Sequence, residues 1–364
     1  MNTFVHTPYT VNGHFLCRNL TGIERFSIEI LKEMDKIVPQ DFLSILIPAN
    51  SPIIPNFKNI QIIQSSKNLT SYWKWTQFTF CNYIRKNKTI GINFANECPI
   101  FNPGLAFLHD IYCKLYSQDL KTVKEKLIKF YSCFLYKYIS KHCKHIFTVS
   151  EFSKNQIIKT YKTNSDKVSV IPNGWEHFKS ISADDSIFNN FPQLKKGHYY
   201  FTLGSLQKRK NLKWILDYAT KHPAEQFAIS GKVINGMESN ELSQLKNLPN
   251  VILLGYLSDE NVKALMQNCK AFIFPSYYEG FGIPPLEALS VGATIVIAKA
   301  ACLPEIYKES AIYIDPYNTD CNLDKLIAES AESCKSHAQS ILNEYTYDKA
   351  AKKLYNVLIN LKAE

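Results

Sequence analysis

Short apolar runs alternate with segments of helical period along the whole chain, and this alternation constrains the fold more than any other feature. A polar stretch at residues 176–196, broken by Asn189-Asn190 and Pro192, separates two series of such runs. The predicted strands of the first series are residues 42–47, 60–63, 91–94, 106–109, 145–149 and 168–171. Those of the second are residues 199–203, 226–229, 251–254, 271–274, 294–297 and 312–314. The predicted helices are residues 23–37, 123–139, 211–220 and 259–267.

Strands that alternate with helices predict an α/β architecture with parallel sheets. The length of 364 residues suits two domains. We expect an N-terminal domain at 1–175, a linker at 176–196, a second domain at 197–345, and a C-terminal helix at 346–364 that packs back toward the first domain. Two doubly wound halves of this kind place a cleft between them, with ligands at the carboxyl ends of the strands.

The composition narrows the possible partners and compartments. The net charge of +10 favours phosphate-bearing substrates or an anionic membrane. Nucleic acid is not expected, because the sequence has no zinc-finger spacing, basic zipper or RNA-binding aromatic signature. None of the ten cysteines forms a Cys-x-x-Cys pair, which predicts reduced thiols. The chain shows neither a bilayer-spanning apolar stretch nor a signal peptide, so the cytoplasm is the expected compartment.

Residues 274–288 carry the most informative motif. Glu279 and Glu287 stand eight positions apart, around a glycine turn (280–283) and Pro284-Pro285. An apolar strand precedes the turn and a helix-like segment follows it, an arrangement that favours anion and sugar binding. Carboxylates accept hydrogen bonds from paired sugar hydroxyls, so we assign both glutamates a binding role over a cap or surface role.

Two further motifs are ambiguous when taken alone. Lys208, Arg209 and Lys210 follow the strand that ends at Gly204, and they favour a diphosphate, although a charge run is usually a solvated face. His109 at a strand end is able to contact a substrate, although a lone histidine is more often structural. Two more segments have simple structural explanations: residues 150–153 are able to form a helix N-cap, and residues 173–174 a turn.

The ordered set of motifs resembles the retaining nucleotide-sugar glycosyltransferases of glycosyltransferase family 4, of the bacterial surface-polysaccharide type. The resemblance covers nearly the whole chain. It implies a GT-B fold, in which two Rossmann-like doubly wound domains face each other across a cleft. The motifs that carry it are Thr21-Gly22-Ile23 with Arg25, His109-Asp110, Val149 to Ser153, Pro172 to Gly174, Gly204 with Arg209 to Asn211, and Glu279-Gly-Phe-Gly with Glu287.

The resemblance also implies a role for each matching residue. Glu279 would contact the hydroxyls of the donor sugar, and Glu287 those of the ribose. Lys210, with Arg209, would neutralise the diphosphate leaving group. The expected catalytic residues are Glu279, His109 and Lys210, and the expected donor-binding residues are Gly22, Gly204, Ser205, Arg209, Lys210, Gly280, Phe281, Gly282, Ile283 and Glu287. Ser205 departs from the pattern, because many relatives have an arginine there.

The expected partners follow from the same resemblance. The donor would be a UDP- or GDP-sugar, and the acceptor a saccharide, linked to undecaprenyl diphosphate at the inner membrane face. No metal or other cofactor is expected, because the sequence contains no Asp-x-Asp and the cations take its place. Three alternatives remain: a transferase that acts on soluble sugar acceptors, a non-catalytic nucleotide-sugar-binding protein, and a sugar-phosphate epimerase.

Residues 119–147 contain seven lysines against two acids, together with a helical stripe of apolar side chains. We expect the stripe to face the core of the N-terminal domain and the lysines to be solvated. The alternative is that this basic amphipathic helix lies on an anionic membrane surface.

Overall fold

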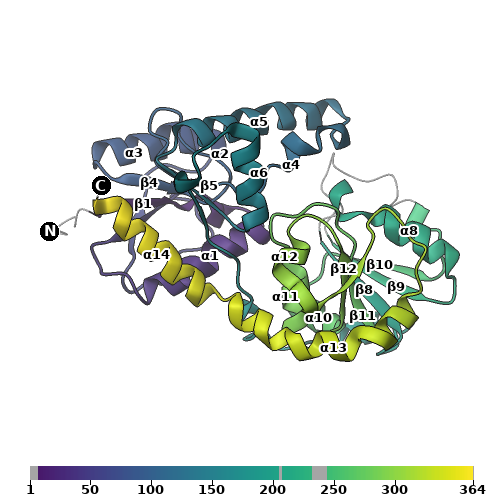
Figure 1. The fold of residues 1–364 in the computed structure, drawn as a ribbon. Helices are drawn as coiled ribbons and strands as arrows, with labels where there is room; N and C mark the ends of the chain where they lie inside the picture. Colours follow the sequence, from purple (N-terminus) through teal and green to yellow (C-terminus); the bar gives the residue numbers. More distant parts are fainter. Residues whose placement is uncertain (1–6, 205–206, 232–243, 364) are drawn as a thin grey trace. The chain divides into compact units, whose positions relative to one another are not determined.

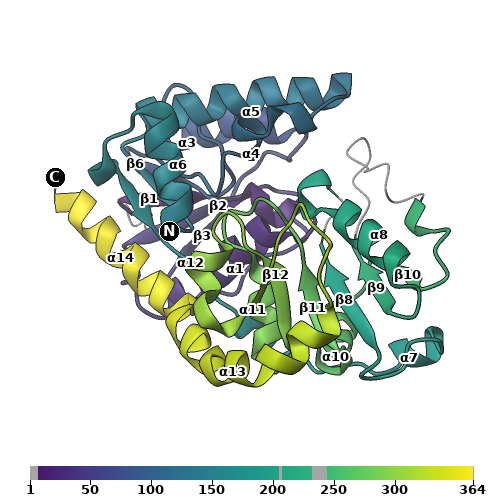
Figure 2. The ribbon, with the colours of Figure 1, turned by 45° about the vertical axis from the view of Figure 1, so that its right-hand side comes forward.

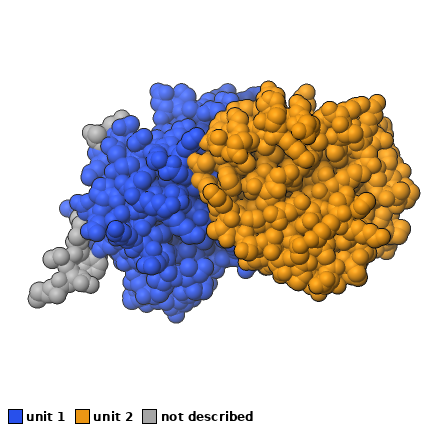
Figure 3. Space-filling model, turned by 90° about the horizontal axis from the view of Figure 1, so that it is seen from below, with its two compact units in different colours: residues 1–115, 128–174, 347–364 blue, residues 116–127, 175–346 orange. Residues whose placement is uncertain are grey.

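The computed structural model describes residues 7–204, 207–231 and 244–363. The chain forms two compact units, which Figure 3 colours separately. Unit 1 comprises Met1–Leu115, Ile128–Gly174 and Tyr347–Glu364, and unit 2 comprises Tyr116–Leu127 and Trp175–Thr346. The segment at 176–196 therefore belongs to unit 2, and the C-terminal helix belongs to unit 1.

Unit 1 is built on a seven-stranded parallel sheet in the order β3-β2-β1-β4-β5-β6-β7 (Figure 1). Its strands are β1 (Tyr9–Asn12), β2 (Leu43–Ile47), β3 (Gln61–Gln64), β4 (Ile90–Asn93), β5 (Leu105–Phe107), β6 (His145–Thr148) and β7 (Val168–Val170). The sequence analysis missed β1, which is short and half polar. All four of its residues are buried, and the polar Thr10 is satisfied there by hydrogen bonds with Ser44 at 2.9 Å and Thr89 at 3.0 Å.

Helices cover both faces of this sheet. They are α1 (Gly22–Asp35), α2 (Tyr72–Lys74), α3 (Cys81–Lys86), α4 (Tyr112–Leu115), α5 (Val123–His142), α6 (Glu151–Tyr161) and α14 (Tyr347–Ala363). Helices α1 and α14 lie together and share one core cluster with the strands (Figure 1). Helices α5 and α6 contribute Ile139 and Ile157 to another cluster, with Ile146 of β6.

The N-terminal part of α5 departs from the expectation for its apolar stripe. Leu135, Tyr136 and Ile139 are buried, as expected. The preceding large apolar side chains are exposed instead, by 77% at Val123, 66% at Leu127, 77% at Phe130, 40% at Tyr131 and 45% at Phe134. The prediction that the stripe faces the core is therefore wrong for this part of the helix.

Unit 2 has a six-stranded parallel sheet in the order β10-β9-β8-β11-β12-β13. Its strands are β8 (Tyr199–Leu203), β9 (Gln226–Ser230), β10 (Val251–Gly255), β11 (Ala271–Phe274), β12 (Ile295–Ala298) and β13 (Ile312–Ile314). Its helices are α7 (Ile187–Asn190), α8 (Leu212–Lys221), α10 (Asp259–Asn268), α11 (Ile283–Ser290), α12 (Leu303–Tyr307) and α13 (Leu323–Glu344). A core cluster joins α8 and α13 to one face of the sheet, and α10 and α11 lie on the other (Figure 2). The predicted α/β class and parallel sheets are confirmed in both units.

Candidate functional site

The candidate site of unit 2 lies where strand order reverses, between β8 and β11. The chain continues from β8 to β9 and β10 on one side, and from β11 to β12 and β13 on the other. Such switch points of parallel sheets are where ligands bind, beyond the carboxyl ends of the strands. The two segments that leave these strands carry the predicted motifs: Lys208–Lys210 forms a short 3-10 turn, η6, and Glu279 follows β11.

Asn211 holds the cationic turn against the segment after β11. It adopts a left-handed backbone conformation with φ of +60°, which asparagine tolerates better than most residues. Its side-chain amide donates to the carbonyls of Pro275 at 3.0 Å and Pro316 at 2.7 Å. The Tyr277 N–H also donates to the Arg209 carbonyl at 3.1 Å. The backbone thus fixes the cations beside the residues that lead to Glu279.

Glu279 is paired with two cations of that turn. Lys210 Nζ lies 2.7 Å from its Oε1, and Arg209 Nη1 lies 2.9 Å from its Oε2. Glu279 is only 5% exposed. Burial raises the pKa of the Glu279 carboxyl, but the charges of Lys210 and Arg209 outweigh burial, so the pKa lies below its ordinary value. The carboxylate therefore stays ionised at neutral pH, and it holds both cations in place.

The glycine turn between the glutamates is fixed by hydrogen bonds from outside it. The Tyr307 hydroxyl donates to the Gly282 carbonyl, and the Cys302 thiol lies 3.3 Å from the Phe281 carbonyl. Gly282 has φ of +89°, and α11 begins directly after it, with Pro284 and Pro285 in its first turn. Proline is favoured there because its missing N–H has no partner within the helix. The turn and the start of α11 are therefore set rigidly next to Glu279.

Gly282→Ala tests how tightly this turn is packed. A Cβ at this position would lie 2.8 Å from Cδ2 of the buried Leu303, and the positive φ would be strained as well. We expect a loss of about 2–4 kcal/mol in the free energy of unfolding, measured by urea denaturation. Gly292→Ala is the matched control, since Gly292 has φ of +80° but an added Cβ would contact nothing within 4 Å. Equal losses in the two variants would show that Leu303 does not confine the turn.

Glu287 lies on α11, 7% exposed. Its Oε1 is 2.8 Å from Nε2 of His177, which belongs to the segment predicted to be a linker. The imidazole can donate this hydrogen bond from Nε2 while the carboxylate keeps its second oxygen for a ligand. Sequence reasoning missed His177, because no motif surrounds it.

The two remaining candidates, Gly22 and His109, lie in unit 1. Gly22 is the first residue of α1, after Thr21, which forms a capping box with Glu24 and also donates from its hydroxyl to the Glu24 carboxylate. His109 follows β5, is 7% exposed, and donates from Nε2 to the Phe94 carbonyl at 2.7 Å. Its ring meets Phe26 edge-on, with 5.3 Å between the ring centres. Burial lowers the pKa of His109 below its ordinary value, so the ring is neutral at physiological pH.

The neutral state of His109 makes unit 1 sensitive to acid. In the unfolded chain His109 takes up a proton near its ordinary pKa of 6.5, whereas the folded chain resists protonation. Its contribution to stability is therefore complete above pH 6.5 and is lost as the pH falls toward the lowered pKa. We expect His109→Asn to reduce the slope of unfolding free energy against pH below 6.5, by at most about 1.4 kcal/mol per pH unit. An unchanged slope, measured by denaturant titrations between pH 5 and 7, would contradict this assignment.

The structure thus brings Arg209, Lys210 and Glu279 into direct contact. Gly204 adjoins this group, since an added Cβ there would lie 3.3 Å from Lys210 Cε. Ser205 lies outside the described residues. We therefore take the cation–glutamate group of unit 2 as the centre of the candidate site.

A family model described as glycosyl transferases group 1 matches residues 184–346. The match contains the cationic turn, the glycine turn and both glutamates. This part of the chain is therefore similar to the group 1 glycosyl transferases. The residues that the sequence analysis selected in unit 2 therefore lie in the segment that this family model matches.

Proteins similar to this chain include two bacterial sugar transferases. The O-antigen chain mannosyltransferase RfbU of Salmonella typhimurium is 27% identical over 233 residues, covering 63% of this chain and 62% of that protein. The chain thus matches less than two thirds of this relative's length. An Escherichia coli protein, UDP-Gal:alpha-D-GlcNAc-diphosphoundecaprenol alpha-1,3-galactosyltransferase, is 23% identical over 309 residues, covering 77% of this chain and 76% of that protein.

Solved structures share the fold of this chain. Sucrose-phosphate synthase from Thermosynechococcus elongatus superposes with a TM-score of 0.74 at 13% identity, covering 98% of this chain and 99% of that one. The predicted GT-B fold is therefore confirmed, with one Rossmann-like sheet in each unit. Within residues 7–204, 207–231 and 244–363, no helix combines the length and apolar character that crossing a membrane requires.

Proposed function

We propose that this protein is a retaining glycosyltransferase, which moves a hexose from a nucleoside-diphosphate sugar to a saccharide acceptor. The observation that carries the proposal is the contact of Glu279 with Lys210 and Arg209 at the switch point of unit 2. A nucleoside diphosphate gains negative charge as it leaves the sugar. Cations that are already fixed in place stabilise this charge without reorganising during the reaction.

Each residue near the switch point then has a distinct task. Lys210 and Arg209 bind the diphosphate, so the reaction proceeds without a metal cofactor. Glu279 orients both cations and accepts a hydrogen bond from a donor-sugar hydroxyl. Glu287, supported by His177, accepts from the ribose hydroxyls. The backbone of residues 280–283, held by Tyr307, contacts the sugar and the β-phosphate. Retention of the anomeric configuration is proposed from the family resemblance.

The names of the relatives suggest candidate substrates. One relative is a mannosyltransferase of the O-antigen chain, and the other uses UDP-Gal with a diphosphoundecaprenol-linked sugar. We propose that this chain uses a UDP- or GDP-hexose and an undecaprenyl-diphosphate-linked saccharide, in assembly of a surface polysaccharide such as O-antigen.

Two measurements test the proposed reaction. A thermal-shift series with UDP, GDP and their hexoses should show strong stabilisation by one matching donor, because ligands that bind only the folded state raise the melting temperature. Release of nucleoside diphosphate from that donor should then require a saccharide acceptor. Stabilisation without acceptor-dependent release would favour a non-catalytic binding protein, whereas acceptor-independent release would favour an epimerase.

The exposed apolar side chains of α5 support the proposal that the acceptor is bound at a membrane surface. Val123, Leu127, Phe130 and Phe134 recur every three or four residues on one helix, and all four are exposed. The exposed lysines on and near this helix are Lys121, Lys124, Lys126, Lys137, Lys141 and Lys144. Apolar side chains flanked by lysines match an anionic bilayer surface. We therefore propose that the protein works in the cytoplasm, with α5 at the inner membrane face.

Flotation with anionic liposomes tests the membrane contact. The wild-type protein should float with vesicles that contain phosphatidylglycerol at low salt, and less so at high salt. The double variant Leu127→Ser/Phe130→Ser should stay in the soluble fraction. Ile54→Ser is the control, since Ile54 is 60% exposed but lies outside α5. Lack of flotation by the wild type, even at low salt, would favour a soluble acceptor.

A further inference from the structure

Unit 1 has its own switch point, which the proposed donor site does not use. Strands β1 and β4 are neighbours in the sheet, and the chain continues from them toward opposite edges. The rule that locates the cation–glutamate group of unit 2 therefore also selects the residues that follow β1 and β4. Buried polar side chains stand there: Asn12 ends β1 and His14 follows it, while Asn93 ends β4 and Glu97 follows it.

The deepest part of this region is fully hydrogen-bonded. The Asn12 amide nitrogen donates to Asn93 at 3.1 Å and to Thr76 at 3.0 Å, and its oxygen accepts from the Trp75 indole at 2.8 Å. Trp75 and Thr76 begin a π-helical turn, η2 (Trp75–Phe80), between α2 and α3. Such turns often occur at functional sites. This base is rigid, because each of its polar groups has a partner.

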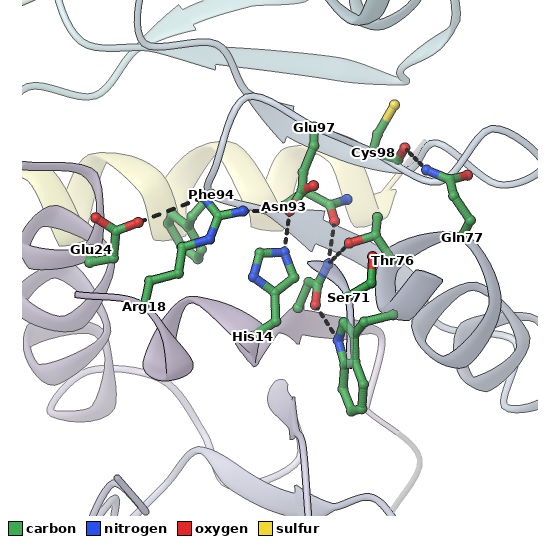
Figure 4. Close-up of polar contacts among 12 residues, drawn as sticks. His14, Arg18, Glu24, Ser71, Thr76, Gln77, Asn93, Phe94, Glu97 and Cys98 are labelled. Atoms are coloured by element: carbon green, nitrogen blue, oxygen red, sulfur yellow. Dashed lines mark hydrogen bonds and ion pairs between the residues drawn. The ribbon is translucent and has the colours of Figure 1, made fainter. Parts of the chain in front are cut away.

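The neighbouring side chains of His14 and Arg18 have hydrogen-bonding groups that are less completely satisfied (Figure 4). His14 is 2% exposed, and its Nε2 contacts Glu97, but its buried Nδ1 has no hydrogen-bond partner among the described residues. The buried Nε of Arg18 likewise has none there. The buried His14 and the partly exposed Arg18 thus each keep a buried nitrogen with hydrogen-bonding capacity, which is costly without a partner.

Arg18 stands between two carboxylates without bonding closely to either one. Its Nη1 lies 3.7 Å from Glu24 Oε1, and its Nη2 lies 3.9 Å from Glu97 Oε1. These separations exceed a normal N–H···O hydrogen bond. The guanidinium group rests 4.3 Å from the ring centre of Tyr72, which sets its plane. The side chain of Arg18 is 28% exposed, so a ligand has access to its donors.

We propose that His14, Arg18, Glu24 and Glu97, the Arg18 cluster, form a binding site for a neutral saccharide. Sugar hydroxyls both donate and accept, so neighbouring hydroxyls fit a guanidinium flanked by carboxylates. A phosphate or carboxylate ligand is disfavoured, because Glu24 and Glu97 would repel it and Arg18 is the one fixed cation of the cluster. The identity of this saccharide as the acceptor rests on the proposed glycosyltransferase function.

Titration of the full chain with methyl glycosides tests the site directly. The probes are the methyl α-glycosides of mannose, galactose and N-acetylglucosamine, observed by saturation-transfer NMR, with methyl glucuronide as the anionic comparison. We expect at least one neutral glycoside to bind, and its dissociation constant to rise about ten-fold in Arg18→Ala and in Glu97→Gln. Arg85→Ala is the matched control, since Arg85 is exposed elsewhere in unit 1.

Arg18→Lys is a second test variant if Arg18→Ala does not fold. It keeps the positive charge but loses the planar guanidinium group that donates to paired oxygens. It should also weaken glycoside binding. The proposal is overturned if no neutral glycoside binds the wild type, if the cluster variants bind as the wild type does, or if the glucuronide binds equally well. Stabilisation by UDP and GDP is measured in parallel. If UDP and GDP do not stabilise the protein while glycosides still bind, the proposed donor chemistry is contradicted and the saccharide site of the Arg18 cluster is not.

Discussion

Glu279→Gln is expected to reduce the turnover rate about 100- to 1,000-fold while nucleoside diphosphate still binds. The amide keeps the shape of the side chain but carries no charge, so it cannot hold Lys210 at 2.7 Å and Arg209 at 2.9 Å as ion pairs. Both cations would still bind the diphosphate, but they would no longer be oriented for the charge that develops during transfer. The measurements are steady-state transfer rates and calorimetric binding of UDP or GDP.

Glu309→Gln is the control for this experiment, because Glu309 is an exposed carboxylate of the same unit. It should leave both the turnover rate and the binding constant unchanged. A Glu279→Gln enzyme with near-normal turnover would show that Glu279 has only a structural role. A parallel loss of diphosphate binding would show instead that the turn needs the carboxylate for its conformation.

Lys210→Ala should weaken binding of the nucleoside diphosphate about ten- to 100-fold and reduce transfer as well. The substitution removes a charge-assisted donor and leaves the buried Glu279 carboxylate in its ion pair with Arg209. The less balanced negative charge would then oppose the anionic diphosphate. Isothermal calorimetry with UDP and GDP measures the loss.

Lys208→Ala provides a matched comparison within the same turn. The Lys208 ammonium lies 3.0 Å from Asp119 rather than near Glu279, and its side chain is 45% exposed. We expect its removal to affect diphosphate binding only weakly, since exposed charges are screened by solvent. Equal losses in the two lysine variants would mean that general positive charge, and not the Glu279 pairing, determines binding.

Most of the architecture was predictable, because buried parallel strands and amphipathic helices leave strong periodic patterns. The twelve runs assigned as strands correspond to β2–β13. Strand β1 was missed because Thr10 and Asn12 interrupt its apolar pattern, and their partners, such as Ser44 and Thr76, are distant in sequence. The exposed stripe of α5 was assigned to the core for a related reason: periodicity shows that a helix has an apolar face, but not what covers it.

The candidate site was only partly predictable. Glu279, Glu287 and the cationic turn stand in dense local motifs, and the sequence alone selected them. The ion pairs of Glu279 join residues about 70 positions apart, and Glu287 meets His177 from 110 positions away. No local pattern encodes such pairs, because they depend on which strands become neighbours in the sheet.

By itself, the sequence determined the α/β class, the two series of strands and the motif residues of the proposed donor site. These properties follow from the spacing of apolar and motif residues that are close together in the sequence. Only the tertiary structure decided that Glu279 holds both cations, and that His14, Arg18, Glu24 and Glu97 gather at the switch point of unit 1. The physical reason is strand order: the sheet places β1 beside β4 and β8 beside β11, and these pairings bring together side chains that lie far apart in the sequence.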